Sequence, residues 1–279
     1  MEILPSAKKI YKKLFQSKRL DQLINAALNF LAGILACAKG MKFPAKFNWE
    51  WKLEMLLNRY EKTTTVFFRE TIKPGMNVVD IGAHIGYYTI LFSKLTGPTG
   101  QVYAFEADKD NFALLAENTK KRRNIILINK ALADKNGEIE FYKINQSTGC
   151  HSIVLPQSSY TKISVPSITL DSFAQSNRLK NIDVIKIDIE GGEPFAFQGM
   201  ETLFRENKNL IIVSEFSPQS LSKINIRPVE FLKKIRGYGF EISQISETGG
   251  LKKLDIENLE NLDFYKTGYT NLVYSKRPL

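Results

Sequence analysis

Residues 78–89 read VVDIGAHIGYYT, which is the pattern of a buried strand, a tight glycine turn and the start of a helix, in that order. Gly82 lets the chain leave the strand through a turn that a Cβ would obstruct, and Gly86 allows loop and helix to approach closely. Backbone amides exposed in such a turn can meet a carboxylate, a phosphate or another polar ligand. The stretch predicts a ligand-binding loop, and glycines that serve turn geometry alone are the alternative.

Outward from this turn, short apolar runs alternate with helical stretches. The expected strands are Asn77–Ile81, Gln101–Phe105, Ile125–Ile128, Val184–Ile187, Leu210–Ser214, Phe240–Ile245 and Leu272–Ser275. The expected helices are Trp49–Ile72, Ile85–Leu95, Asp110–Lys121, Glu193–Glu206 and Pro228–Tyr238. Near-continuous apolar strands that alternate with helices are typical of an α/β fold with a mostly parallel sheet buried on both faces.

A β insertion interrupts this alternation at residues 134–171. Within it, Glu138–Tyr142, Ser152–Leu155 and Lys162–Val165 have the pattern of further strands. We therefore expect two parts, a basic helical extension over residues 1–52 and one α/β domain over residues 53–279.

The glycine turn fits two classes of ligand. A dinucleotide site expects G-x-G-x-x-G, whose second glycine lets the backbone approach a pyrophosphate. That position is His84 here, which is awkward for pyrophosphate and tolerable for a methionine moiety. Glu106 ends the next strand, where a carboxylate can accept both ribose hydroxyls of an adenosine ligand. S-adenosylmethionine is the favoured cofactor, and a nicotinamide-dependent oxidoreductase is the alternative.

Three stretches together resemble the FkbM family of S-adenosylmethionine-dependent methyltransferases. They are VVDIGAHIGYYTILFSKLTGPTGQVYAFEAD (78–108), TLDSF (169–173) and IKIDIEGGE (185–193), and the similarity extends roughly over Lys73–Ser217. The resemblance implies the class I methyltransferase (Rossmann-like) fold, with a seven-stranded sheet whose last strand is antiparallel. It also implies O-methylation of a sugar, glycan, lipid-linked or other hydroxylated small molecule. Many relatives have asparagine in place of His84 and alanine in place of Gly192.

The acidic segment DVIKIDIEGGE (183–193) holds the catalytic candidates. Along an extended strand, Lys186, Asp188 and Glu190 would share one face. Ligands collect outside the carboxyl ends of the strands, so Asp188 and Glu190 are expected where methyl donor and acceptor meet. We favour Asp188 or Glu190 as the catalytic base, or as the group that orients the acceptor hydroxyl. Glu193 would support that residue, and Lys186 would neutralise the acidic side chains. The alternatives are a Mg²⁺-like ion on these carboxylates and a purely structural Lys186–Asp188 ion pair.

Ten positions form the expected cofactor site. They are Asp80, Gly82, Ala83, His84, Gly86, Glu106, Ala107, Lys130, Ala131 and Asp188. The Asp80 carboxylate is suited to bind an ammonium group or a loop amide. Lys130 and Ala131 follow the third expected strand, where proteins of this fold usually contact the adenine. His84 and His151 are alternative bases.

No metal ligands are assigned from the sequence. The two cysteines, Cys37 and Cys150, and the two histidines fit no usual zinc spacing. The cysteine count also gives no reason to assume an oxidising compartment, so we expect a cytoplasmic protein.

The positive charge is concentrated in the N-terminal extension. Residues 1–52 hold ten Lys and Arg against three acids, a net +7, whereas residues 53–279 hold 29 against 26, a net +3. The near balance of the main domain argues against a nucleic-acid partner. A non-catalytic cofactor-binding protein remains an alternative to an enzyme.

The apolar run Leu23–Ala38 lies inside this basic extension and is shorter than the ~20 residues of a spanning helix. A helix packed on its own domain or on a second subunit is the default expectation. Peripheral contact of residues 8–46 with the inner face of an anionic membrane is the functional alternative. A cleaved secretory signal is disfavoured, because the basic region is too long and the domain needs a cytosolic cofactor.

Overall fold

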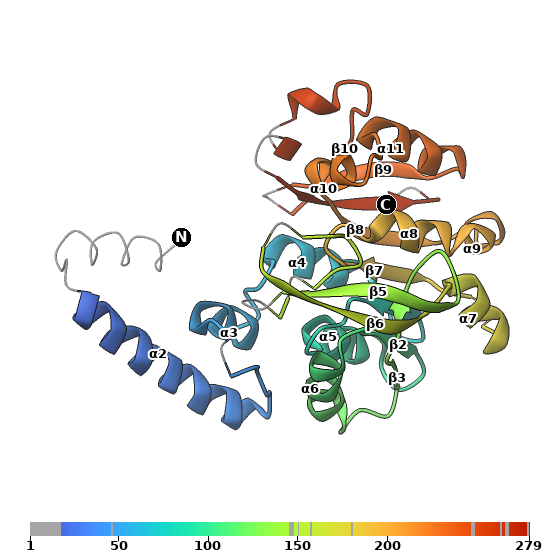
Figure 1. Ribbon diagram of the computed structural model, residues 1–279. Coiled ribbons are helices and arrows are strands. Elements are labelled where there is room, and N and C mark those ends of the chain that lie inside the picture. Colours follow the sequence, from blue (N-terminus) through green and yellow to red (C-terminus); the bar gives the residue numbers. More distant parts are fainter. Residues whose placement is uncertain are drawn as a thin grey trace. The chain divides into compact units, whose positions relative to one another are not determined.

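The computed structural model describes residues 18–279 except 46, 145–147, 150, 157, 180, 247–248, 263, 266–267 and 278, with only the backbone for residues 18–21. The chain divides into two compact units, with the boundary between Tyr60 and Glu61. The described helices of the first unit are α2 (Lys18–Lys39) and α3 (Trp49–Leu56) (Figure 1). The expected helix over 49–72 is interrupted at residues 57–61, where Asn58 and Glu61 adopt left-handed backbone angles.

The second unit is an α/β domain. Its elements in chain order are α4 (Lys62–Thr71), β1 (Asn77–Ile81), α5 (Tyr87–Thr96), β2 (Gln101–Phe105), α6 (Lys109–Thr119), β3 (Ile125–Ile128), β4 (Ala131–Leu132), β5 (Gly137–Ile144), β6 (Tyr160–Ile168), α7 (Leu170–Ser176), β7 (Val184–Ile187), α8 (Glu193–Gln198), α9 (Glu201–Glu206), β8 (Ile211–Phe216), α10 (Pro218–Lys223), α11 (Pro228–Gly237), β9 (Glu241–Ile245), β10 (Leu251–Lys253), the 3₁₀ turn η1 (Leu259–Asn261) and β11 (Thr270–Ser275).

The main sheet has eight strands in the order β10-β9-β11-β8-β7-β1-β2-β3, running from one end of the domain to the other (Figure 1). The five strands from β3 to β8 pair in parallel, and the last strand, β11, pairs antiparallel with both β8 and β9. This confirms the expected mostly parallel sheet. The eighth strand, β10, is an addition at the edge, where it pairs with β9.

Both faces of the sheet are buried, as the continuous apolar strands predict. On β1, Val79 and Ile81 belong to the large core that also holds Phe197 and Phe204 from α8 and α9. The alternate positions of β1 face the other way, where Asp80 accepts a hydrogen bond from Thr89 of α5. Because β1 pairs in parallel with both β2 and β7, the carboxyl ends of these three strands lie side by side at one edge of the sheet.

The insertion forms a second sheet, β4-β6-β5, in which β5 and β6 pair antiparallel. Two of the strands expected there are confirmed, since they lie within β5 and β6. The expected strand Ser152–Leu155 is wrong, because Ser152 makes only an isolated bridge to Tyr142. Its hydroxyl instead donates to the carbonyl oxygen of Glu190 (2.8 Å), which draws the segment toward the main domain.

The expected helix Glu193–Glu206 is also wrong, because it is divided into α8 and α9. The backbone of Gly199 passes so close to Ala133 that an added Cβ would lie 2.1 Å from its carbonyl oxygen. The Asp171 carboxylate then accepts the amides of Thr202 (2.8 Å) and Leu203 (3.0 Å) and caps the new helix.

Candidate active site

A cleft of about 550 Å³, including its open mouth, lies at the carboxyl ends of β1, β2 and β7. Eight of the expected site residues line it: Gly82, His84, Glu106, Ala107, Lys130, Ala131, Asp188 and Glu190. The other five, Asp80, Ala83, Gly86, Lys186 and Glu193, do not line it. They are all buried behind its walls.

The glycine turn shapes one wall through close backbone contacts. A Cβ added to Gly82, which has φ +77°, would lie 1.9 Å from the carbonyl oxygen of Asp188. One on Gly86, at φ +95°, would lie 2.8 Å from the Leu115 side chain. Gly82 requires glycine for space and for backbone angle, and Gly86 requires it for its backbone angle. His84 has φ 51°, a region in which asparagine and histidine are enriched among non-glycine residues.

Glu106 is fixed at the end of β2 by two backbone amides. Its Oε2 accepts the amide N–H of His84 and its Oε1 that of Asp108, each at 2.8 Å. Burial raises the pKa of this carboxyl to about 7 against the opposing effect of those hydrogen bonds. Each carboxylate oxygen can accept a second donor, so the side chain can receive two neighbouring hydroxyl groups of a ligand.

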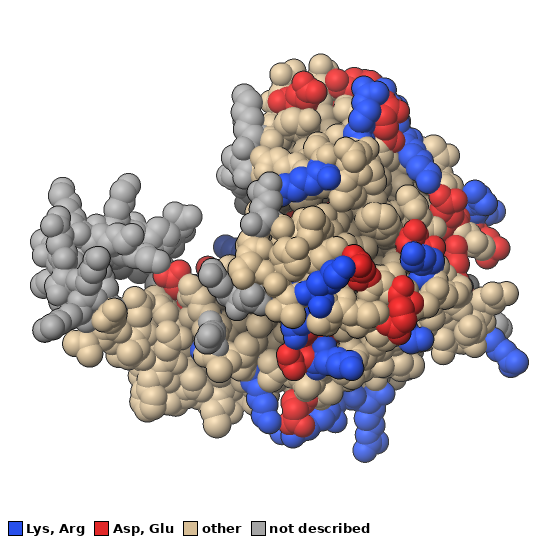
Figure 2. Space-filling view, in the orientation of Figure 1, with Lys and Arg blue, Asp and Glu red and all other residues tan. Residues whose placement is uncertain are grey.

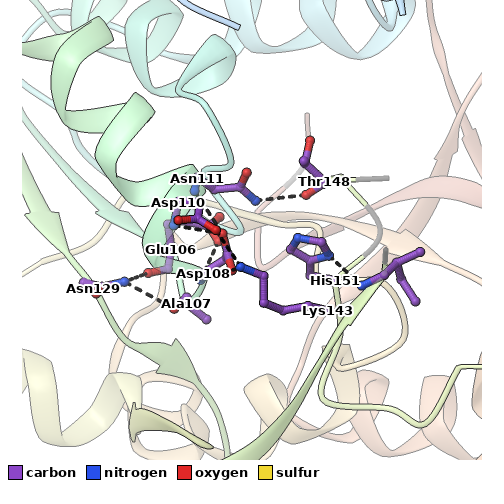
Figure 3. A network of polar contacts seen from close by, with 10 residues as sticks. Glu106, Ala107, Asp108, Asp110, Asn111, Asn129, Lys143, Thr148 and His151 are labelled. Carbon is purple, nitrogen blue, oxygen red and sulfur yellow. Dashed lines mark hydrogen bonds and ion pairs between the residues drawn. The ribbon is translucent and has the colours of Figure 1, made fainter. Parts of the chain in front are cut away.

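The insertion is tied to the end of β2 by a polar network, drawn in Figure 3. Lys143 of β5 lies 2.5 Å from Asp108 and 2.8 Å from Asp110. Burial opposes ionisation of Asp108, but the hydrogen bonds from Lys143 and the Asn111 amide and the charge of Lys143 together lower the pKa of Asp108. Asn111 donates to the carbonyl oxygen of Thr148 (2.9 Å), which brings that part of the insertion to the cleft.

The two histidines at the cleft are poor candidates for the base. The amide of Ile144 donates to Nδ1 of His151 (3.0 Å), so the neutral ring carries its proton on Nε2 and has its accepting nitrogen engaged (Figure 3). Burial lowers the pKa of His151. Burial also lowers the pKa of His84 to about 4, and its Nε2 lies 3.1 Å from Thr148 Oγ1.

Lys186 lies at the centre of the acidic groups. Its Nζ is 3.2 Å from Asp188 Oδ2, 3.9 Å from Asp80 Oδ1 and 5.2 Å from the centre of the Tyr88 ring. Burial works against the ammonium, yet the charges of Asp188, Asp80 and Glu61 together raise the pKa of Lys186. The lysine is therefore charged and balances carboxylates on both sides of it.

The expectation that Glu190 continues the strand face of Lys186 and Asp188 is wrong. Strand β7 ends at Ile187, and Glu190 has φ 55° in the turn that follows. The Gly82 loop packs against the carbonyl of Asp188, so the backbone cannot run straight on. Glu190 still lines the cleft.

Glu193 stabilises this turn and does not line the cleft. Its Oε1 accepts the amide of Ile189 at 3.0 Å. Burial raises the pKa of Glu193 to about 7, against the opposing effect of its backbone hydrogen bonds. Its place behind the wall makes it a positioning residue.

Two further acids, Glu215 and Glu61, belong to the same charged group and were missed. Burial, followed by the charges of Asp188 and Glu190, raises the pKa of Glu215 to about 10. Glu61 accepts hydrogen bonds from Tyr88 (2.8 Å) and Asn271 (3.4 Å), and burial raises its pKa. Glu215 could have been found by extending the expected strand Leu210–Ser214 by one residue, since it stands near the carboxyl end of the parallel strand β8.

No group of three or more His, Cys, Asp or Glu side chains arranged to hold a metal ion occurs among the described residues. The Lys186 ammonium instead occupies the position between Asp80 and Asp188.

Comparison with solved structures gives only distant similarity. An O-methyltransferase from Bacillus cereus in complex with SAH aligns with a TM-score of 0.44 and 13% identity over 96% of both chains. Fibrillarin from Aeropyrum pernix with bound S-adenosyl-L-methionine has a TM-score of 0.44 and 14% identity, over 77% of this chain and 74% of that one. Similarity at this level supports no functional comparison.

Sequence comparison is more informative. The 2-O-methyltransferase NoeI of Sinorhizobium fredii is 30% identical over 165 residues, which are 53% of this chain and 66% of that protein. The hexuronic acid methyltransferase AglP of Haloferax volcanii is 25% identical over 150 residues, 52% of this chain and 59% of that protein. The match thus spans less than two thirds of each relative. The methyltransferase FkbM domain family matches residues 80–242, more than half of the chain, and the chain therefore belongs to this family.

Proposed function

We propose that this protein is an S-adenosylmethionine-dependent O-methyltransferase whose acceptor is a hydroxyl group of a sugar, glycan or other small molecule. The observation that carries the proposal is one cleft that is lined both by a cofactor-type glycine turn and by carboxylates. Glu106 and the Gly82 turn line it, and so do the acidic side chains of Asp188 and Glu190. Family membership and the names of the two relatives, a 2-O-methyltransferase and a hexuronic acid methyltransferase, support it.

The residues present fit the cofactor. Glu106 offers accepting positions to two ribose hydroxyls, and Phe141, Leu132 and Ile153 provide apolar wall for a purine. Lys130 and Ala131 line the same part of the cleft. When bound, S-adenosylmethionine supplies an electrophilic methyl group on a sulfonium centre.

The chain's own contribution to the transfer is to orient the acceptor and take its proton. Asp188 is held by Lys186 through Oδ2 and by the packing of its backbone against Gly82, so its carboxylate has a fixed position. We assign Asp188 or Glu190 to bind the acceptor hydroxyl and to accept its proton as the new carbon–oxygen bond forms. Lys186 and Glu193 hold these groups in place.

The proposal uses no divalent ion, because Lys186 already supplies the positive charge between the acids. The cofactor is made in the cytoplasm, and we place the reaction there.

Binding and transfer test the proposal in two steps. Calorimetry with S-adenosylmethionine, S-adenosylhomocysteine and NAD⁺ should show micromolar binding of the two sulfur ligands only. Transfer of a labelled methyl group is then measured on neutral sugars and on hexuronic acids, with Glu190→Gln as the impaired control. Binding of NAD⁺ alone would establish the oxidoreductase alternative, and cofactor binding without transfer to any hydroxylated acceptor would support a non-catalytic protein.

A further inference from the structure

Helix α2 in the N-terminal unit has two faces of different chemistry. One face packs on α3: Asn25 Oδ1 accepts the indole N–H of Trp49 (2.9 Å), and Asn29 Oδ1 accepts from Nζ of Lys52 (3.4 Å). Ala32 lies one turn further along and is fully buried. Both asparagines of this apolar helix are therefore used in contacts within the unit.

The opposite face is apolar and exposed to solvent. Leu23, Phe30 and Ile34 recur at intervals of seven and four residues, which aligns them on one side of a helix, and Leu31 stands beside them. Their side chains are 68%, 71%, 54% and 58% exposed, respectively. On the face seen in Figure 2, the described part of the N-terminal unit shows mostly uncharged surface. Four large apolar side chains in one exposed stripe mark an interaction surface.

Basic residues flank the stripe at both ends. Lys39 and Lys42 follow it, and the sequence before it carries six cations from Lys8 to Arg19. Of these six, Lys8, Lys9, Lys12 and Lys13 lie outside the described residues. An apolar stripe between two groups of lysines is complementary to an anionic bilayer, in which acyl chains lie beneath a negative headgroup layer.

The packing of α3 distinguishes a helix that lies on the bilayer from one that crosses it. Among the described residues, Gln22–Lys39 is the one segment long and apolar enough to span a membrane, and the 22 residues of α2 extend about 33 Å. If α2 crossed the bilayer, the side chains of Trp49 and Lys52 that contact it would have to enter the hydrocarbon with it. Lying flat, α2 buries only the stripe and leaves α3 in water.

We propose that the stripe Leu23, Phe30, Leu31 and Ile34 docks this protein on the surface of a membrane containing anionic lipid, with α2 parallel to the bilayer plane. The proposal goes beyond the methyl transfer assigned to the second unit.

Flotation of the full-length protein with lipid vesicles tests the proposal. Vesicles of phosphatidylcholine with about one third phosphatidylglycerol should carry the wild-type protein upward, whereas pure phosphatidylcholine vesicles should carry much less of it. Binding should fall as salt screens the lysines. The double variant Phe30→Glu/Ile34→Glu should partition at least tenfold more weakly. Leu251→Glu, which changes an exposed leucine of β10, is the matched control and should bind as the wild type does.

Two results would overturn the proposal. One is a wild-type protein that does not float with anionic vesicles. The other is a double variant that floats as well as the wild type. If the double variant instead converts a dimer into a monomer in light scattering, the stripe is a contact between two copies of this chain. Affinity for S-adenosylmethionine, measured on the same variant, should be unchanged, so that loss of docking is distinguished from failure of the proposed function.

Discussion

Replacing Lys186 with methionine should destabilise the protein strongly at neutral pH. Lys186 is 5% exposed and keeps its place because it balances Asp80, which is fully buried, and Asp188. Removing one partner of a buried ion pair costs about 3–5 kcal/mol, since the remaining charge is left unbalanced. Asp188 has 29% of its side chain exposed and can be hydrated, so we expect the lower end, about 3 kcal/mol.

The loss should depend on pH in a definite direction. Without the ammonium, the pKa of Asp80 in the folded protein rises further above its unfolded value. A raised carboxyl pKa destabilises the folded state at high pH, and the penalty disappears as the pH falls and the group is protonated. The difference in unfolding free energy between wild type and variant should therefore shrink from pH 7 to pH 5.

Urea unfolding followed by far-ultraviolet circular dichroism at both pH values measures this difference. The expected loss corresponds to a fall in the melting temperature of about 6–12 °C for a domain of this size. Lys162→Met is the matched control: Lys162 pairs with Glu140 at 2.8 Å on the surface and should matter little. A loss below about 1 kcal/mol, or one that is the same at both pH values, would refute the central role given to Lys186.

The remaining predictions concern the cleft. Glu106→Ala should weaken binding of S-adenosylmethionine at least tenfold in calorimetry, and unchanged affinity would remove the ribose assignment. In the wild type, that affinity should rise as the pH increases through about 7, because the ionised Glu106 carboxylate accepts both hydroxyls; a flat profile between pH 6 and pH 8 would contradict this. Glu190→Gln should bind the cofactor nearly as well as the wild type but turn over more slowly, and full activity would exclude Glu190 from the mechanism. Gly82→Ala should lose cofactor binding, because its Cβ would meet the Asp188 carbonyl at 1.9 Å; normal binding would show that this contact can relax. Incubation with a chelator should leave methyl transfer unchanged, and activity restored only by added Mg²⁺ would show that an ion is needed.

The strands around the cleft could be predicted from the sequence because their signal is local. β1, β2, β3 and β7 have the bounds expected from the sequence. A parallel strand buried on both faces has no polar alternation, so an apolar run and a following turn residue are enough to place it.

The features that escaped prediction all depend on contacts between distant parts of the chain. α8 and α9 are separated where Gly199 meets Ala133, and nothing in residues 193–206 alone records that contact. Glu61 is held by Tyr88 and Asn271 and interacts with the charge of Asp188, all of which are far from it in sequence. Residues brought together by the sheet order have no fixed spacing that a motif could capture.

The contact between Gly82 and Asp188 joins the cofactor turn to the acidic turn in the lining of the cleft. The carbonyl of Asp188 occupies the space where any side chain at position 82 would begin, so the cofactor turn after β1 and the acidic turn after β7 pack directly on each other. The same contact bends the chain after Ile187, which turns Glu190 away from the strand direction and into the lining of the cleft. A shift of the glycine turn on cofactor binding would therefore be passed to Asp188 by direct contact. For this reason, cofactor binding should alter the environment of Asp188 before any acceptor is present, and a change in its carboxyl ¹³C chemical shift on adding S-adenosylhomocysteine would measure this.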